Sequence, residues 1–332
     1  MTNRFSKLLQ HFLTSYIMGE CNYSVNTKAS YSTTFYLLLV FLKKEKNINP
    51  NKIEIELITK DLIIQFLDWL ETQRHVSIRT RNQRLAAIKS FYKYVQVNEP
   101  DLLDTCLNIL SIKNKKVPNK MISYFSEEEM KLMINYLNEE KNLKLLTMIC
   151  VLYESASRVS EFISIKLDDL NLNENATITL HGKGNKTRII PISKELAMLI
   201  NKYLEDSYIN YGDDYLFYSN QKKKYSRFGI NYIINQLVEK LHLIYPNYFN
   251  GNYHPHSIRH TKATHLYNNS TPLLYIKDFL GHSTITSTEI YAKPDMKKER
   301  QEILKNAQEL DVKNKYSKDK KEALDDWLKK NM

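Results

Sequence analysis

Glycine is scarce in this chain, with 7 among 332 residues. This scarcity disfavours long glycine-rich loops and the glycine cradle that holds phosphates in dinucleotide-binding folds. Long hydrophobic runs are missing too. The apolar run 36–42 is far shorter than the about 20 residues that a membrane-spanning helix needs. Charged and polar side chains interrupt residues 1–15, where a signal peptide would carry its apolar stretch. The sequence therefore predicts a cytoplasmic protein with no membrane partner.

Cysteine is also rare, and the three cysteines, Cys21, Cys106 and Cys150, show no paired spacing. They suit a reducing compartment, and we expect them to pack in cores. Four histidines crowd the segment 254–265, but no HExxH pattern, cysteine pair or ligating carboxylate accompanies them. We therefore expect no metal and no cofactor, and we interpret His260 and His265 as packing and hydrogen-bonding residues.

Positive charge is in excess, with a formal net charge of +11. Residues 1–117 hold 17 Lys and Arg against 10 Asp and Glu, and the remainder holds 31 against 27. A basic N-terminal third is compatible with binding to a phosphate backbone. A soluble basic protein of another kind would have the same balance, so charge alone leaves both interpretations open.

Apolar residues at helical spacing predict a helical N-terminal domain over residues 1–111. Helices are expected over 28–44, 58–73 and 78–95, the last with Ser77 as its N-cap. One side of helix 78–95 is apolar, and its cations are Arg79, Arg81, Arg84, Lys89 and Lys93. Such a helix is typical of proteins that follow a DNA backbone. A solvated surface helix has the same pattern of apolar and cationic residues, but we favour contact with DNA.

A cationic segment without apolar periodicity, 112–122, contains Pro118 and predicts an interdomain linker. The second domain, 123–310, begins with a helix after Ser126, which forms a capping-box pattern with Glu129. The domain is expected to be mostly helical. One β-hairpin is predicted, with strands 176–181 and 186–192 around the turn 182–185.

The C-terminal segment 311–332 starts with a charged stretch of low periodicity. A short amphipathic segment follows, with one apolar face made of Ala323, Leu324, Trp327 and Leu328. An isolated helix this short is marginal in water and needs a surface on which to dock. Docking within the same chain and docking on a neighbouring protomer are the two alternatives. We favour the neighbour, because the charged stretch is long enough to reach it.

Six polar residues between positions 158 and 291 suit one chemical problem, the transfer of a DNA phosphodiester to a side chain. They are Arg158, Lys183, His256, Arg259, His282 and Tyr291. Fixed guanidinium groups stabilise the charge that builds on the non-bridging oxygens in the transition state. Arg158 and Arg259 fit this role, and Glu161, one helical turn after Arg158, is expected to hold that guanidinium or His256 in place.

The other four residues suit the proton transfers and the attack. A neutral imidazole at His256 accepts and returns the proton of the nucleophile, and His282 donates a hydrogen bond to a phosphate oxygen. Lys183 lies in the hairpin turn between two glycines and protonates the departing 5′ oxygen, with Lys186 as the second candidate. Tyr291 is the nucleophile once nearby cations favour its phenolate. Lys186 and Arg188 are expected to contact DNA.

The order and spacing of these residues resemble the tyrosine recombinase, or phage integrase, family. Three segments show this resemblance: HGKGNKTRIIPI around Lys183, HPHSIRH around Arg259, and LGHSTITSTEIYA, in which Tyr291 lies nine residues after His282. The resemblance is strong over 120–293 and looser over 1–117. Ser157 departs from the small-residue run that usually precedes the first arginine, but the arginine and the following Ser-Glu pair remain.

The resemblance implies a mainly α fold with a small β-hairpin or sheet, arranged as a two-domain, C-shaped DNA clamp. It implies site-specific recombination through a 3′-phosphotyrosyl intermediate, without metal or ATP. The expected partners are double-stranded DNA with paired inverted repeats and three further copies of the chain in a tetramer. We expect no separate arm-binding module, which makes the chain resemble the simple Xer or Cre type. A type IB topoisomerase is the alternative, and a non-enzymatic DNA-binding protein is a third.

Overall fold

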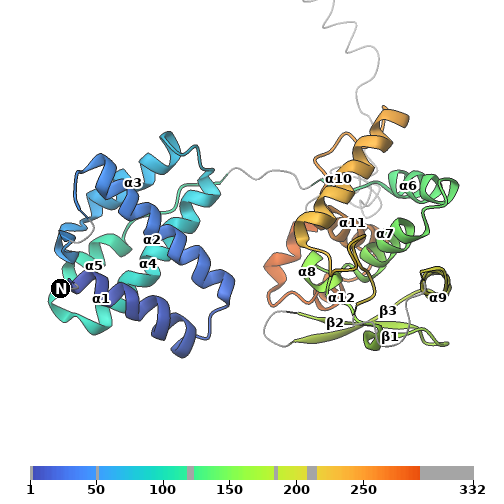
Figure 1. The fold of residues 1–332 in the computed structure, drawn as a ribbon, viewed down its shortest axis with the longest axis horizontal. Coiled ribbons are helices and arrows are strands. Elements are labelled where there is room, and N and C mark those ends of the chain that lie inside the picture. Colours follow the sequence, from blue (N-terminus) through green and yellow to red (C-terminus); the bar gives the residue numbers. More distant parts are fainter. Residues whose placement is uncertain (1–2, 50–51, 118–122, 183–185, 208–214, 292–332) are drawn as a thin grey trace, which may run out of the picture. The chain divides into compact units, whose positions relative to one another are not determined.

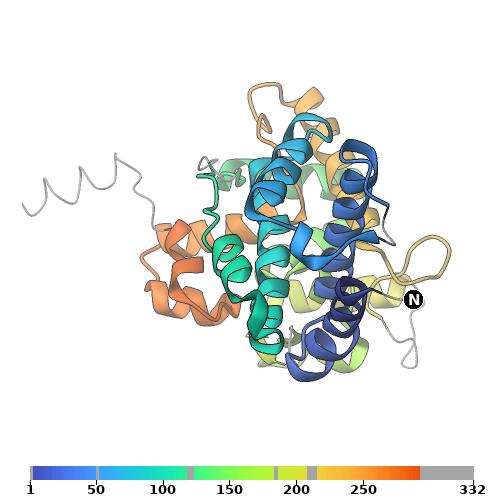
Figure 2. The same ribbon diagram turned by 90° about the vertical axis from the view of Figure 1, so that its left-hand side faces the viewer.

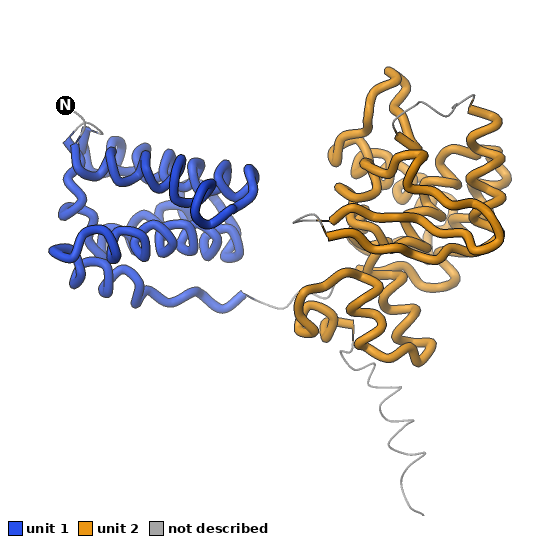
Figure 3. Tube along the Cα trace, turned by 90° about the horizontal axis from the view of Figure 1, so that it is seen from below, with its two compact units in different colours: residues 1–120 blue, residues 121–332 orange. Residues whose placement is uncertain are grey.

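The structure is a computed structural model that describes residues 3–49, 52–117, 123–182, 186–207 and 215–291. The chain forms two compact units, Met1–Lys120 (unit 1) and Met121–Met332 (unit 2), which are coloured separately in Figure 3. Each unit has its own hydrophobic core. Over the described ranges, no helix is long and apolar enough to cross a membrane.

The regular structure in the described part of unit 1 is helical, and Figures 1 and 2 show its helices from two directions. Its α-helices are α1 (Arg4–His11), α2 (Val25–Glu45), α3 (Lys60–Thr72), α4 (Ile78–Asn98) and α5 (Leu103–Leu110). A π-helix, Phe12–Glu20, follows α1, and short 3₁₀ turns cover Ile55–Leu57 and Pro100–Leu102. Residues 112–117 have no regular structure and lie within the predicted linker.

Helix starts in unit 1 follow the local sequence. Ser24, Thr59 and Ser77 each accept a hydrogen bond from a backbone N–H in the first turn of α2, α3 and α4, respectively.

Aromatic side chains pack these helices into one core. The Phe91 ring of α4 lies edge-on to Phe35 of α2, with the ring centroids 5.2 Å apart. The predicted helices of this domain are therefore confirmed, α4 with its predicted cap.

Unit 2 is mostly helical, as predicted. Its helices are α6 (Glu127–Glu139), α7 (Leu143–Ser155), α8 (Val159–Phe162), α9 (Lys194–Asp206), α10 (Arg227–Ile244), α11 (Pro255–Asn268) and α12 (Leu273–Leu280). Short 3₁₀ turns cover Leu167–Asp169, Ile285–Ser287 and Glu289–Tyr291. The predicted capping box is confirmed, because Ser126 Oγ accepts from the Glu129 N–H while the Glu129 carboxylate accepts from the Ser126 N–H.

A three-stranded antiparallel sheet lies along one side of unit 2 (Figure 1). Its strands, β1 (Leu170–Asn171), β2 (Thr177–His181) and β3 (Thr187–Pro191), pair in the order β1-β2-β3. Ile178 and Leu180 alternate along β2 with more exposed residues and point into the core. The predicted hairpin is confirmed. The short strand β1, which extends it to a sheet, was not predicted.

Candidate active site

Helix α11 places three of the site's side chains close together. Pro255 occupies the first turn, where a missing backbone N–H costs nothing. Residues three or four apart lie on the same helix face, so His256 is a neighbour of both Arg259 and His260. The rings of His256 and His260 meet edge to face, with their centroids 4.4 Å apart. His256 is exposed, whereas Arg259 and His260 are buried.

Arg259 is the most firmly held of the predicted catalytic residues. Only 1% of it is exposed, and its guanidinium donates to the carbonyl oxygens of Ala156 and Leu280, each at 2.6 Å. Ala156 has a left-handed backbone, with φ of 43°, at the end of α7, and Leu280 ends α12. Burial, aided by the positive charges of Arg158 and Arg188, lowers the pKa of Arg259 to about 9. The group stays charged at neutral pH.

Arg158 lies at the start of α8 and is tied to the same part of the fold. Its guanidinium donates to Glu161 Oε1 at 2.8 Å and to the Gly281 carbonyl oxygen at 3.3 Å. Its side chain is 37% exposed, whereas that of Glu161 is only 3% exposed. The first arginine therefore keeps one side open to solvent. Glu161 holds its guanidinium, which is one of the two roles expected for this carboxylate.

Arg188 shares that carboxylate. From β3 it donates to both oxygens of Glu161, at 3.1 and 2.8 Å, and its side chain is only 13% exposed. Burial would raise the pKa of Glu161, but the hydrogen bonds and charges of Arg188 and Arg158 outweigh it and lower that pKa to about 2. The structure thus shows a contact within the protein for Arg188 that was not expected, and its contact with DNA stays a prediction.

His282 and Tyr291 complete the described part of the site. His282 follows Gly281, whose φ of 64° ends α12, and its Nδ1 lies 2.9 Å from Thr288 Oγ1. Tyr291 is 7% exposed. Its ring lies in a small apolar cluster made of Ala156, Ala263, Ile276 and Leu280. The site therefore gathers segments that are distant in the sequence around the ends of α7 and α12.

The hydroxyl of Tyr291 lies 2.7 Å from Nδ1 of His260. His256, the proton acceptor expected from the sequence, is therefore not the partner of the tyrosine in this structure. Burial raises the pKa of Tyr291 to about 12, although the charges of Arg259 and Arg158 oppose the rise. His260 is a site residue whose contact with Tyr291 we did not predict. The only signal was its place directly after Arg259.

The imidazoles of the site favour their neutral forms. Desolvation, followed by the positive charge of Arg259, lowers the pKa of both His256 and His282 to about 4. His256 keeps an exposed side, so water weakens this shift, but its direction is downward. A neutral imidazole is the form that accepts a proton.

The cations predicted on α4 divide into two groups. Arg81 is 4% exposed and pairs with Glu71 at 3.4 Å, and Arg84 donates to the Ser30 carbonyl oxygen at 3.0 Å. Both make contacts within unit 1, and their contact with DNA stays a prediction. Arg79 and Lys93 are exposed, and Lys89 is half-buried. Lys186 is exposed at the start of β3.

Lys183 lies outside the described residues. The strands beside it are in place, because His181 pairs with Thr187 and the Gly182 N–H donates to the Lys186 carbonyl oxygen at 2.7 Å. The predicted segment 311–332 also lies outside the described part of the chain, with its apolar face of Ala323, Leu324, Trp327 and Leu328.

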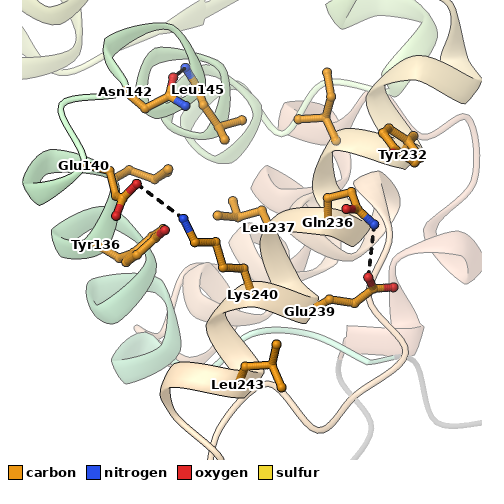
Figure 4. A pocket seen from close by; sticks show the side chains of 12 residues that line it. Tyr136, Glu140, Asn142, Leu145, Tyr232, Gln236, Leu237, Glu239, Lys240 and Leu243 are labelled. Atoms are coloured by element: carbon orange, nitrogen blue, oxygen red, sulfur yellow. Dashed lines mark hydrogen bonds and ion pairs between the residues drawn. The ribbon is translucent and has the colours of Figure 1, made fainter.

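A cavity of about 510 Å³ lies elsewhere in unit 2, between α6 and α10 (Figure 4). Tyr136 and Glu140 line it from α6, and Leu237 and Lys240 line it from α10. The Lys240 ammonium donates to Glu140 Oε2 at 3.3 Å. Arg158, His256, Arg259, His282 and Tyr291, the predicted catalytic residues that the structure describes, do not line this cavity, so we assign it no part in the chemistry of the site.

Comparison with known proteins identifies the class to which this fold and site belong. Residues 123–298 match the phage integrase family, and residues 9–97 match the N-terminal SAM-like domain of phage integrases. The first match covers more than half of the chain. The chain belongs to the phage integrase family, whose members are tyrosine recombinases, and its activity is site-specific DNA recombination. The resemblance found in the motifs is confirmed.

Relatives match along most of their length. Tyrosine recombinase XerA of Pyrococcus horikoshii is 31% identical over 303 residues, which cover 90% of this chain and 93% of that protein. Tyrosine recombinase XerC of Bacillus pumilus is 28% identical over 306 residues, covering 88% and 92%. The Tn1549 transposon integrase, solved with transposon right end DNA, has a TM-score of 0.70 at 17% identity, covering 91% of this chain and 99% of that one. It shares the fold.

Burial of His260 should make stability depend on pH. Burial is the main cause that lowers its pKa from the ordinary 6.5 to about 3, so between these values the unfolded chain binds more protons than the folded one. The free energy of unfolding therefore falls as pH falls through 6.5. We expect His260 to contribute a loss of about 2 kcal/mol between pH 7.5 and pH 5.

Urea unfolding of the full chain, followed by circular dichroism at both pH values, checks this expectation. The His260→Asn variant removes the titrating group, and the other histidines are common to both proteins. The wild type should lose about 2 kcal/mol more than the variant on acidification. Equal losses would mean that His260 titrates in the folded protein much as it does in the unfolded chain.

Proposed function

We propose that Tyr291 attacks the scissile phosphate of a bound DNA strand. The phenol oxygen forms a bond to phosphorus, the bond from phosphorus to the 5′ oxygen breaks, and a 3′-phosphotyrosyl link with a free 5′-hydroxyl results. The 5′-hydroxyl of a partner strand then reverses the step. The observation that carries the proposal is the convergence of Arg158, Arg259 and Tyr291 on the ends of α7 and α12. Arg259 and Tyr291 contact Ala156 and Leu280, and Arg158 contacts Gly281, which follows Leu280.

The two arginines supply positive charge to the phosphate in the transition state. Two hydrogen bonds to backbone carbonyl oxygens hold the Arg259 guanidinium, and Glu161 holds that of Arg158. The two guanidinium groups therefore need little movement when negative charge develops on the phosphate. Removing one such donor typically costs about 10²–10³ in rate. We infer that these fixed charges, with energy conserved in the phosphotyrosyl link, make the reaction independent of metal and ATP.

The remaining groups handle protons. His256 is exposed beside buried Arg259 and favours its neutral form, which suits it to take the proton of Tyr291 and return it. His282, held by Thr288, donates a hydrogen bond to a non-bridging oxygen. Lys183 protonates the departing 5′ oxygen from the hairpin turn.

The expected substrate is double-stranded DNA with paired inverted repeats. Domain 1–111 and the catalytic domain 123–310, joined by 112–122, would clamp the duplex between them, with Arg79, Lys89, Lys93 and Lys186 on phosphates. Two duplexes require a tetramer. We place the protein in the cytoplasm, acting on a mobile element or on chromosome dimers. A type IB topoisomerase would use the same chemistry on one duplex, but the family match does not favour it.

Selection of bound duplexes from a random library, followed by strand-transfer assays on the selected sequence, tests this proposal. We expect an inverted repeat, a covalent protein–DNA adduct, and recombinant products from two such sites in buffer with EDTA and without ATP. Relaxation of supercoiled plasmid without site preference and without recombinants would instead support the topoisomerase alternative.

The C-terminal segment gives a separate prediction. We propose that the apolar face at 323–328 docks on a neighbouring protomer and so links four active sites. Truncation after Asp311 should leave binding to a single site intact and abolish synapsis and recombination. Native gel shifts with one and two sites measure both effects. Unchanged tetramer formation by the truncated protein would refute docking on the neighbour.

A further inference from the structure

The contact between His260 and Tyr291 has a consequence for the attack step. We propose that His260 is a positioning residue, which accepts a hydrogen bond from the Tyr291 hydroxyl and fixes the phenol oxygen for attack. The inference rests on the proposed role of Tyr291 as nucleophile. The two atoms lie 2.7 Å apart, a normal length for a hydrogen bond to a hydroxyl group.

Burial of both side chains strengthens this hydrogen bond. His260 is 6% exposed and Tyr291 is 7% exposed, so little water competes for the hydroxyl. The apolar cluster around Tyr291 fixes the ring but offers its oxygen no polar partner. The two rings are inclined by 50°, with their centroids 5.4 Å apart. His260 thus supplies the directional contact that sets where the phenol oxygen points.

The position of His260 in the sequence couples the nucleophile to the phosphate-binding groups. It follows Arg259 directly and lies one helical turn after His256, and its ring packs against that of His256. One rigid helix, α11, therefore carries an arginine for the phosphate, the expected proton acceptor and the residue that orients the tyrosine. A shift of His260 would move the phenol oxygen relative to the other two.

His260 suits an accepting role in the resting protein. A neutral imidazole with its proton on Nε2 presents a lone pair on Nδ1, whereas an imidazolium presents only donors. Burial lowers the pKa of His260 to about 3 and raises that of Tyr291 to about 12. The proton therefore stays on Tyr291 in the resting protein, and during attack it passes to His256.

Three substitutions separate positioning from packing. In His260→Asn the amide oxygen takes the place of Nδ1 as acceptor. His260→Gln places its amide near the position of Nε2, and His260→Phe keeps a ring without an acceptor. Cleavage of a nicked suicide substrate should be nearly normal for His260→Asn. It should be about 100-fold slower for the other two, the order of loss expected when a reacting atom is misplaced by about 1 Å.

A joining assay separates loss of positioning from a general structural defect, because only the structural defect should slow joining. In a strand ending in a 3′-p-nitrophenyl phosphate, the 5′-hydroxyl of a second strand attacks phosphorus. The P–O bond to the nitrophenol breaks, p-nitrophenolate leaves, and the proton of the hydroxyl passes to His256. Tyr291 takes no part, so His260→Phe and Tyr291→Phe should both join strands at the wild-type rate.

The outcomes are distinguishable. If His260→Phe cleaves like the wild type, or if His260→Gln equals His260→Asn, the positioning role is wrong. Equal loss of cleavage and joining in His260→Phe would assign His260 to packing alone. If Tyr291→Phe still forms the covalent adduct, the nucleophile is wrong, and the failure lies in the proposed function and not in the role of His260.

Discussion

The Tyr291→Phe protein is expected to bind its target DNA like the wild type and to form no covalent adduct on a nicked suicide substrate. Phenylalanine keeps the ring in the apolar cluster with Ala156, Ala263, Ile276 and Leu280 but removes the attacking oxygen. The lost hydrogen bond to His260 should cost about 1 kcal/mol of stability, too little to unfold the protein. Strand cleavage should fall to background, as measured by SDS gels of labelled DNA.

Tyr267→Phe is the matched control for this variant. Tyr267 packs against the same apolar cluster, so its substitution removes a phenol oxygen from the same neighbourhood. We expect it to cleave like the wild type. An SDS-resistant adduct with Tyr291→Phe, or its loss with Tyr267→Phe alone, would contradict the assignment of the nucleophile.

The Lys183→Ala protein is expected to cleave about 10²–10⁴-fold more slowly than the wild type, the usual contribution of a general acid. An alkoxide is a poor leaving group, so the 5′ oxygen needs a proton as its bond to phosphorus breaks. A substrate with sulfur at that bridging position releases a thiolate, which leaves without protonation. Rates on the oxygen and sulfur substrates should therefore differ greatly for the variant, with the sulfur substrate restoring cleavage.

Lys186→Ala serves as the control. Lys186 is exposed at the start of β3, three residues further on, and its loss should weaken DNA binding without a preference between the two substrates. If sulfur restores Lys186→Ala and not Lys183→Ala, Lys186 is the acid. If sulfur restores neither variant, protonation of the 5′ oxygen comes from outside the hairpin.

Local signals predicted the elements of this fold well. Ser77 begins α4, Ser126 and Glu129 form their capping box, and the hairpin pairs where the turn glycines indicated. Each of these features depends on residues a few positions apart, so the sequence contains the whole interaction. The strand β1 was missed because its two residues are too few to show an alternating pattern.

Side-chain partners that are distant in the sequence could not be predicted in the same way. Helical periodicity placed Arg84 on α4, but it could not predict the hydrogen bond that Arg84 donates to Ser30, 54 residues away. Arg188 lies 27 residues from Glu161, and its bond to the Glu161 carboxylate, which Arg158 also contacts, was not predicted. The contact of His260 with Tyr291 spans 31 residues. Motif spacing selected the candidate reactive residues, and the fold shows which groups lie against them.

The chemical structure of the adduct itself tests the central claim most directly. Wild-type protein trapped on a nicked suicide substrate should be digested with trypsin and nuclease, and the linked peptide sequenced by mass spectrometry. We predict one peptide in which Tyr291 carries a nucleotide through its 3′ phosphate. A nucleotide attached to any other residue, or attached through a 5′ phosphate, would contradict it.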